Sequence, residues 1–355
     1  MPSMKTYWAD FLGSKIKFMK QKLFSIGLIL SFALISLAQI TCPLTTFASQ
    51  NPTPPSIAQS ENASNPQPIA VKGTKINLIK PEGFTESNNF PGFQQSTTGT
   101  TIVVTEFPGA YTDVASGFTP ENLKPRGMSL ISKEKVSVDS YQGFLIKFTQ
   151  NANGQEYGKL GVIFGDDKES VFIVASFPIE LEKDLSSLLK DSLIKAKWDR
   201  KKEVDPFADL SFSVDGSGPL KFAKRLQSTL LYSQDGKFPV EVETPIFVVG
   251  KSVSDFPEGN TDYKAFAENR LNQSVENRNI MVVSGEAVTI DNINGYEIIA
   301  NGNDSATNSP VAIYQVLLFD DKNYFIMQGL VGAKSKDQFL VEFKKIARSF
   351  KKKTN

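Results

Sequence analysis

The amino-acid sequence predicts an α+β protein built from two tandem copies of one domain. The phrase VSVDSYQGF at 136–144 is repeated in pattern by VTIDNINGY at 288–296. Each phrase is typical of a strand end, a tight turn and the start of the next strand. Both halves continue with strands rich in β-branched residues and close with an amphipathic helix. Two copies of about 130–150 residues each also fit the usual size of a domain.

The first copy is predicted over residues 72–199. Thr119 and Pro120 carry the chemistry of a helix start, as N-cap and first helical residue. Strands are expected at 75–79, 100–107, 132–138, 143–150, 160–164 and 170–177, with a closing helix from about 179 to 198. The residues expected on the buried face of that helix are Leu181, Leu185, Leu188, Leu189, Leu193 and Ala196.

The second copy is predicted over residues 206–352, after a charged, proline-containing boundary. Thr261 is expected to cap one helix, and the capping box at 335–338 to open the closing helix. Gly143 and Gly295 are expected at equivalent positions, each at a turn or bulge with little room for a side chain. Strands are expected at 210–214, 245–249, 280–290, 295–301, 311–319 and 324–331, and the inward residues of the closing helix are Phe339, Leu340, Phe343, Ile346, Ala347 and Phe350.

Residues 1–48 are predicted to be a signal peptide or an N-terminal anchor. A basic stretch at 15–22 precedes an apolar run at 23–38, and Ala48 ends a small-residue cleavage pattern. Cleavage after Ala48, retention as an anchor and acylation of Cys42 all remain open. The residues before Cys42 depart from the usual lipobox. Residues 49–71 are rich in Pro, Ser and Asn and are predicted to be a disordered linker.

The composition excludes several kinds of chemistry. The chain has no histidine and a single cysteine, Cys42, which lies in the predicted leader. Ser-His-Asp and Cys-His catalysis, histidine-ligated metals and intramolecular disulfides are therefore excluded. An exported chain without disulfides has to be stabilised by its core, and about 300 residues are enough for that.

The charge gives no indication of a nucleic-acid partner. The formal net charge is +1, and it becomes −3 without the leader, which holds five lysines and one aspartate. A near-neutral to acidic protein lacks the electrostatic footprint of nucleic-acid binding. The one basic cluster, at 344–353, is interpreted as a helix C-terminus favoured by the helix dipole. A patch for an acidic surface is the alternative.

No residue is nominated as catalytic, cofactor-binding or metal-binding, and no cofactor is expected. The acidic pairs at 166–167 and 320–321 could bind calcium but are interpreted as turn residues. The glycine-rich stretch at 216–218 lacks the Lys-Ser/Thr ending of a phosphate loop. The 27 phenylalanines are interpreted as core for two domains rather than as a hydrophobic ligand pocket.

The chain resembles the PsbP-like superfamily of α/β/α sandwiches, which includes lumenal extrinsic proteins of photosystem II and many small secreted bacterial domains. The matching features are the turn at 81–84 after an early strand, the strand at 102–107 ending at Pro108, the turn at 139–143 and the helix at 181–198.

The resemblance spans residues 72–352 and is weaker at 216–219, where GSGP replaces the compact turn of the first copy. It implies two α/β/α sandwich domains, each an antiparallel sheet with helices on both faces. It implies no catalytic residues, and the metal-binding histidines of some plant members have no counterpart here.

These observations favour an exported, non-enzymatic binding or assembly protein. The expected location is the periplasm or the thylakoid lumen, with a membrane tether as an option. The expected partner is a membrane protein complex such as a photosystem. The alternative is a binder of small hydrophobic or lipid molecules, held between sheet and helices or between the two domains. A third class, a secreted hydrolase that uses carboxylates, would need a deep acidic cleft.

Overall fold

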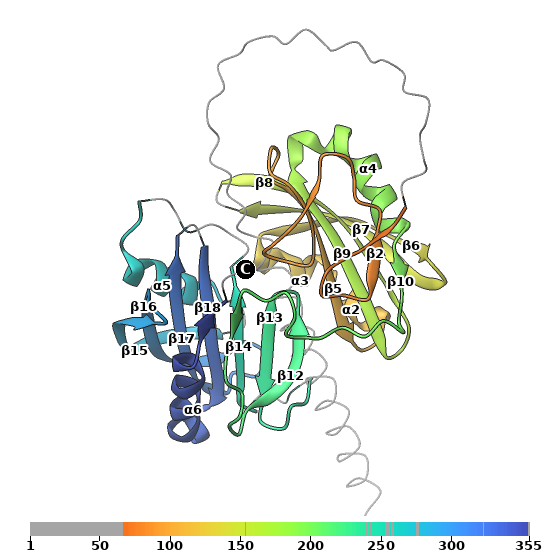
Figure 1. Ribbon diagram of the computed structural model, residues 1–355. Coiled ribbons are helices and arrows are strands. Elements are labelled where there is room, and N and C mark those ends of the chain that lie inside the picture. The colour runs from red at the N-terminus through yellow and green to blue at the C-terminus, as the bar shows by residue number, and fades with distance from the viewer. Residues whose placement is uncertain are drawn as a thin grey trace, which may run out of the picture.

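The computed structural model describes residues 67–353, apart from 153, 239, 241–242, 253–255, 257–258, 275–276 and 322. The predicted leader at 1–48 and residues 49–66 of the predicted linker lie outside the described residues. Two separate antiparallel sheets of seven strands each follow one another along the chain (Figure 1).

The two sheets have the same strand order. The first runs β3-β4-β5-β9-β8-β7-β6 and the second β12-β13-β14-β18-β17-β16-β15. The first comprises β3 (Thr85–Glu86), β4 (Gly92–Gln95), β5 (Thr100–Pro108), β6 (Met128–Val138), β7 (Tyr141–Ala152), β8 (Gln155–Gly165) and β9 (Glu169–Pro178). The second comprises β12 (Lys221–Leu226), β13 (Thr229–Ser233), β14 (Ile246–Lys251), β15 (Asn277–Ile290), β16 (Ile293–Asp304), β17 (Pro310–Asp320) and β18 (Asn323–Gly332).

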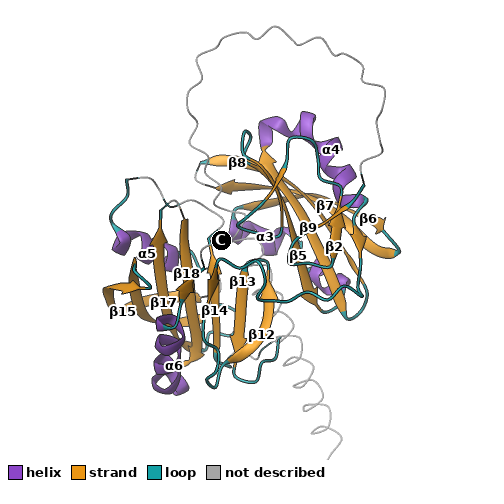
Figure 2. Cartoon of the chain, in the orientation of Figure 1, coloured by secondary structure: helices purple, strands orange, loops and turns teal. Residues whose placement is uncertain are grey.

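Helices cover both faces of each sheet (Figure 2). The closing helices α4 (Glu182–Ile194) and α6 (Lys336–Arg348) pack on equivalent strands, β8 and β9 in one case and β17 and β18 in the other. The opposite faces carry α2 (Tyr111–Ser116), α3 (Pro120–Leu123) and α5 (Tyr263–Asn272). The predicted fold class, two tandem α/β/α sandwiches with antiparallel sheets, is confirmed. Single 3-10 turns occupy Lys124–Arg126, Ile179–Leu181 and Ala333–Ser335.

A short accessory pairing closes each domain. In the first, β2 (Ile76–Leu78) pairs with β1 (Ile69–Ala70) and with β10 (Lys197–Trp198). In the second, β11 (Phe212–Ser213) pairs with β19 (Lys351–Lys352). The segment before each sheet is thus tied to the segment after the closing helix. The prediction that the first closing helix reaches Trp198 is wrong, because this return strand takes the last residues.

The repeated phrase forms equivalent hairpins, β6–β7 and β15–β16. Asp139 and Asp291 occupy the turns with φ of 54° and 53°. A Cβ on Gly143 would lie 2.3 Å from the carbonyl oxygen of Ile163, and one on Gly295 would lie 2.2 Å from that of Leu317. The predicted equivalence and lack of space are confirmed. Both glycines lie inside strands rather than at a turn or bulge, because the neighbouring strand causes the crowding.

The caps of two helices and the buried face of one closing helix differ from the prediction. Thr119 caps α3 as predicted, whereas Asp262 rather than Thr261 caps α5, and Ser335 makes no capping hydrogen bond. Leu188 is 40% exposed, because it lies one residue, or about 100°, from Leu189 at the centre of the buried stripe. Of the other residues expected to face the core, Leu189, Leu193, Ala196, Phe339, Phe343, Ile346, Ala347 and Phe350 are buried, and Leu181, Leu185 and Leu340 are half-buried.

The sequence prediction missed the hairpins that begin each sheet, β3–β4 and β12–β13. It also missed helix α2. No helix in the described part of the chain is long and apolar enough to cross a membrane.

Candidate functional site

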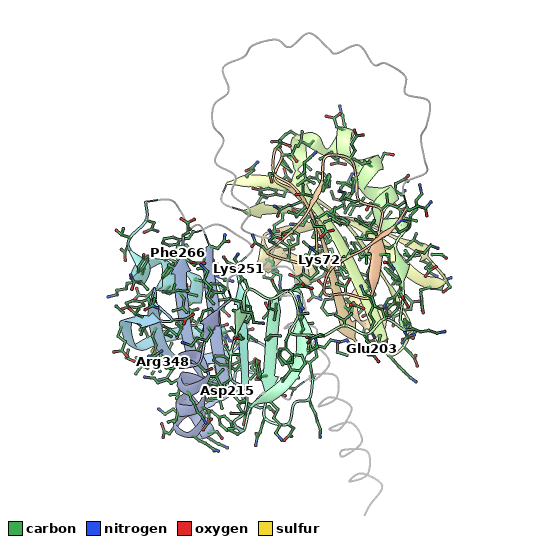
Figure 3. The ribbon with its side chains drawn as sticks, in the orientation of Figure 1. Lys72, Glu203, Asp215, Lys251, Phe266 and Arg348 are labelled. Atoms are coloured by element: carbon green, nitrogen blue, oxygen red, sulfur yellow. The ribbon has the colours of Figure 1, made fainter. Side chains whose placement is uncertain are left out.

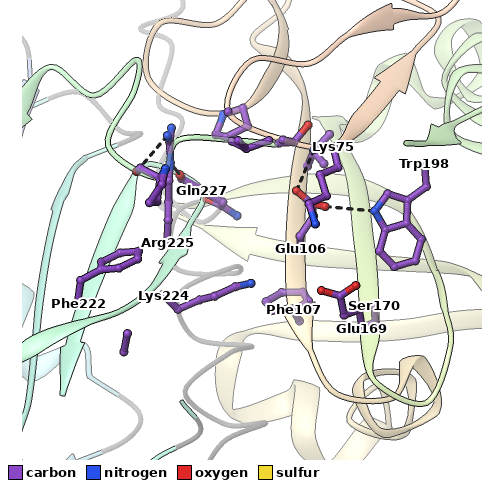
Figure 4. A pocket seen from close by; sticks show the side chains of 17 residues that line it. Lys75, Glu106, Phe107, Glu169, Ser170, Trp198, Phe222, Lys224, Arg225 and Gln227 are labelled. Carbon is purple, nitrogen blue, oxygen red and sulfur yellow. Dashed lines mark hydrogen bonds between the residues drawn. The ribbon is translucent and has the colours of Figure 1, made fainter. Parts of the chain in front are cut away.

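A pocket of about 220 Å³ lies between the two domains (Figure 4). Its walls come from residues 73–75 before the first sheet, from β5, from the start of β9, and from β12 with its turn. Strand β10 supplies Trp198, and the connection between the domains, on which Glu203 lies (Figure 3), supplies Val204 and Pro206.

The pocket forms where two sheet edges meet. Strand β4 pairs with β5 only up to Val103, so the rest of β5 has a free side, and β12 contacts it there. Gln227, at the turn after β12, donates from Nε2 to Oγ1 of Thr105 at 2.8 Å, and both residues are buried. The preceding residue, Leu226, is packed in the apolar cluster of the first domain that contains Phe107. These contacts dock the second domain on the first.

The two carboxylates of the pocket are already bound by donors of the protein. Glu106 accepts the backbone N–H of Lys75 at 3.1 Å and Nε1–H of Trp198 at 3.3 Å. Glu169 pairs with Arg200 at 2.7 Å, and the guanidinium of Arg200 lies 4.8 Å from the ring centre of Trp198. Neither carboxylate is left to act alone as a general base.

Of the three basic side chains of the pocket, one is held by hydrogen bonds and two are not. The guanidinium of Arg225 donates to the carbonyl oxygens of Gln227 and Ala208, each at 2.7 Å, and burial lowers its pKa. Lys75 and Lys224 are half-buried, and their ammonium groups make no hydrogen bond or ion pair with any described residue. The Lys224 side chain extends from β12 toward the first domain (Figure 4). The lining of the pocket therefore holds three cations, Lys75, Lys224 and Arg225, against the two carboxylates of Glu106 and Glu169.

The lining also contains aromatic surface. Phe222, on the β12 side, packs against Phe207 of the connection with ring centres 4.8 Å apart. Ser170 also lines the pocket, and its hydroxyl has no hydrogen-bond partner within the described residues. Its side chain is fully buried and presents no surface to a ligand in the pocket.

The residues that the sequence placed in acidic pairs lie at turns. The carboxylate of Asp166 accepts the N–H groups of Glu169 and Lys168, at 2.9 and 2.8 Å, and these bonds lower its pKa to about 2. Asp320 accepts a hydrogen bond from Nζ of Lys352 at 2.7 Å. No group of three or more Asp, Glu, His or Cys residues that could hold a metal occurs among the described residues. The stretch at 216–218 is a loop before β12.

The basic C-terminal cluster binds carboxylates of its own domain. Lys344 and Arg348 on α6 pair with the buried Glu297 at 3.0 and 2.8 Å. Lys351 and Lys352 pair with Asp291 and Asp320, at 2.9 and 2.7 Å. Four of the six cations thus serve packing between the helix end and the sheet.

Sequence reasoning did not identify the residues of the pocket. Lys75, Glu106, Trp198, Lys224 and Arg225 come from four separate segments, and no motif links them. The one local signal is the stretch at 221–227, which contains three basic and three apolar residues and is not predicted as a strand.

No family model matches the chain, and no curated protein sequence matches it significantly. The solved structures that resemble it include cyanobacterial PsbP (CyanoP) from Synechocystis sp. PCC 6803, with 12% identity over 40% of this chain and 82% of that chain, at a TM-score of 0.25. LpqN, involved in cell envelope biogenesis of Mycobacterium tuberculosis, is 13% identical over 34% of this chain and 82% of that chain, at a TM-score of 0.29. The T6SS immunity protein TplEi of Pseudomonas aeruginosa is 11% identical over 79% of this chain and 96% of that chain, at a TM-score of 0.26. Likenesses at these TM-scores support no conclusion about function.

Proposed function

We propose that this chain is an exported, non-enzymatic accessory protein that binds a small anionic ligand in the pocket between its two domains. The observation that carries the proposal is the unequal treatment of charge in the pocket. Three cations, Lys75, Lys224 and the half-buried Arg225, face two glutamates there, and the ammonium groups of both lysines have no partner among the described residues. Such a site attracts an anion.

The size and lining of the pocket define the ligand class further. Pockets for drug-sized ligands are about 300–1,000 Å³, so about 220 Å³ favours a smaller molecule than a lipid. Trp198 and Phe222 supply aromatic surface beside the lysines. A small carboxylate with a flat apolar part fits both features. The site holds no arrangement of nucleophile and base, which supports binding rather than catalysis.

Fluorescence of Trp198 gives a direct test. The chain has two tryptophans, Trp8 and Trp198, so the variant Trp8→Phe places the only indole in the pocket. Titration of this variant with benzoate should give a saturable change in emission. The double substitution Lys75→Met and Lys224→Met should abolish it. Lys221→Met, on the exposed part of β12 outside the pocket, should leave it unchanged.

Two results would contradict the proposal: no saturable response to benzoate or to inorganic phosphate, or a response that survives the double lysine substitution. Far-ultraviolet circular dichroism should show that every variant has the fold of the parent, so that a lost response reports on the pocket.

A membrane protein complex is the proposed partner, and the periplasm or thylakoid lumen the proposed location. The leader pattern at 1–48 supports export, and the motifs shared with the PsbP-like superfamily support an accessory role beside such a complex. The full chain, purified from its native membranes after mild solubilisation, should bring down one reproducible membrane complex. Sequencing of its N-terminus in the same sample would show whether the leader is cleaved after Ala48. Recovery without any reproducible partner would contradict this role.

A further inference from the structure

The outer edge of the second sheet exposes three consecutive large apolar side chains. Met281, Val282 and Val283 of β15 are 67%, 46% and 61% exposed. Met281 and Val282 pair with β16 in regular register, so their side chains point to opposite faces of the sheet, and both faces of the edge are open here. Met281 also lines a groove of about 500 Å³ together with Pro310 and Val311, which extends the apolar surface. Exposed patches of this kind mark interaction sites.

The corresponding edge strand of the first sheet carries charged side chains. Strand β6 is equivalent to β15 and carries Lys133, Glu134 and Lys135 at its centre. Charged residues on an edge strand prevent pairing with another chain. In β15, by contrast, residues 279–285 are all uncharged. The second domain therefore lacks, over this stretch, the charged residues that protect the edge of the first domain.

The charges of β15 are self-complementary in one arrangement. Arg278 precedes Val282 by four residues, and Glu286 follows it by four. Antiparallel pairing of two copies about a two-fold axis at Val282 places Arg278 of each copy opposite Glu286 of the other. Met281 then lies opposite Val283. In-register parallel pairing would place like charges together, and an antiparallel shift by two residues would lose both ion pairs.

Both charged groups are available for these contacts. Glu286 is exposed and makes no ion pair or hydrogen bond within the described residues. Arg278 is exposed, and among the described residues its guanidinium donates only to the neutral amide oxygen of Asn308, at 3.1 Å. Bulges interrupt the pairing of β15 with β16 on either side of Met281 and Val282. The lengths of the arginine and glutamate side chains accommodate the offset of one residue that a bulge introduces.

We propose that two copies of this protein associate through antiparallel pairing of their β15 strands, with Val282 on the two-fold axis and two Arg278–Glu286 ion pairs flanking it. This interface is isologous, as expected for a two-fold dimer. It lies on the outer edge of the second sheet, at the opposite side of that sheet from β12 and the pocket.

Charge reversal tests the register. Sedimentation velocity of the full chain should show a monomer–dimer equilibrium. Arg278→Glu and Glu286→Arg, each alone, should raise the dimer dissociation constant about tenfold or more, because each creates two like-charge contacts. The variant that carries both changes should have the dimer dissociation constant of the parent again. Lys135→Glu on β6 is the matched control and should have no effect. A monomer at all concentrations, or single reversals without effect, would overturn the proposal.

Cross-linking tests the two-fold axis independently of any association through the leader. Cys42 is the only cysteine, so Cys42→Ser gives a background without thiols. In that background Val282→Cys should form a covalent dimer on mild oxidation, since residues directly opposite in an antiparallel pair lie within disulfide distance. Ser284→Cys, two residues away and also exposed on the strand, should cross-link poorly. Equal cross-linking of the two variants would exclude the proposed axis.

Discussion

The carboxylate of Asp291 accepts the backbone N–H of Lys352 at 2.7 Å and thereby ties the turn of the repeated hairpin to the end of the described chain. Asp139 makes the equivalent bond with the backbone N–H of Trp198, at 3.4 Å. The lysine before each of these residues, Lys351 or Lys197, pairs with the same aspartate. The repeated aspartate therefore serves two purposes, because it occupies a left-handed turn position and holds the strand that follows the closing helix.

Replacing Asp291 by alanine should loosen the return strand β19 without unfolding the sheet. Hydrogen bonds from Lys351 and from the N–H of Lys352 lower the pKa of Asp291. Its contribution to stability is therefore present above the ordinary pKa of an aspartate and is lost as the pH falls through the lowered value. Amide exchange at Lys352 should become several-fold faster in the variant at neutral pH. The difference between the two proteins should shrink in acid to the pH-independent cost of alanine in a left-handed turn, and a difference that does not shrink would contradict this role.

Alanine at Gly143 or Gly295 should destabilise the domain that contains it. The added Cβ would lie within 2.3 Å of a backbone carbonyl oxygen in either case, so strands have to separate. We expect a loss of about 1–3 kcal/mol in the free energy of unfolding, measured with urea. Gly302→Ala is the control, since its Cβ would meet no atom closer than 3.3 Å. Equal effects at all three positions would show that the crowding is unimportant.

Replacing the buried Lys159 by methionine should stabilise the first domain. Lys159 is fully buried and donates to Oγ of Ser176 at 2.8 Å, and burial lowers its pKa from 10.5 to about 7. The unfolded state therefore binds more protons between these values, and stability should rise with pH across that window. In the variant this slope should disappear. Lys190→Met, on the exposed face of α4, is the control, and a slope unchanged in Lys159→Met would contradict the assignment.

Replacing Glu297 by alanine should destabilise the second domain by about 3 kcal/mol, because two cations and a buried hydroxyl lose their partner. Burial alone would raise the pKa of Glu297, but the hydrogen bonds from Tyr314 and Lys344 and the charge of Arg348 lower it. Its stabilisation is therefore lost as the pH falls. Leu145 occupies the equivalent place in the first domain, which shows that leucine fits there. Glu297→Leu combined with Tyr314→Leu should therefore lower the free energy of unfolding by less than the sum of the single changes, because both partners of one hydrogen bond are removed together. Additive losses, measured by urea unfolding, would contradict coupling.

Removing the side chain of Leu226 should uncouple the two domains. Leu226 is 4% exposed and packs in the core of the other domain. Leu226→Ala should cost about 2–4 kcal/mol of docking energy, and calorimetry should then resolve two transitions where the parent shows one. Leu188→Ala, an exposed leucine on α4, should leave the profile unchanged. A single transition in both variants would show that the interface is not the coupling element.

Much of the fold follows from local pattern. The alternation of apolar residues, the turn at Asp139 and Asp291, and the apolar stripes of the closing helices identified the principal strands and both terminal helices. These signals are local, because side-chain period and turn chemistry act over a few residues. The short hairpins β3–β4 and β12–β13 escaped prediction, since two-residue to six-residue strands at a sheet edge carry weak patterns.

The sequence by itself determined the α+β class, the duplication and the exclusion of histidine and cysteine chemistry, because these depend on composition and on short-range periodicity. Only the tertiary structure decided which charges are satisfied. Glu106 and Glu169 accept hydrogen bonds from protein donors, and Lys159 is buried beside Ser176. The ammonium groups of Lys75 and Lys224 find no acceptor among the described residues. Such outcomes depend on contacts between segments distant in sequence, and the free energy of a charge is set by the groups that surround it in space.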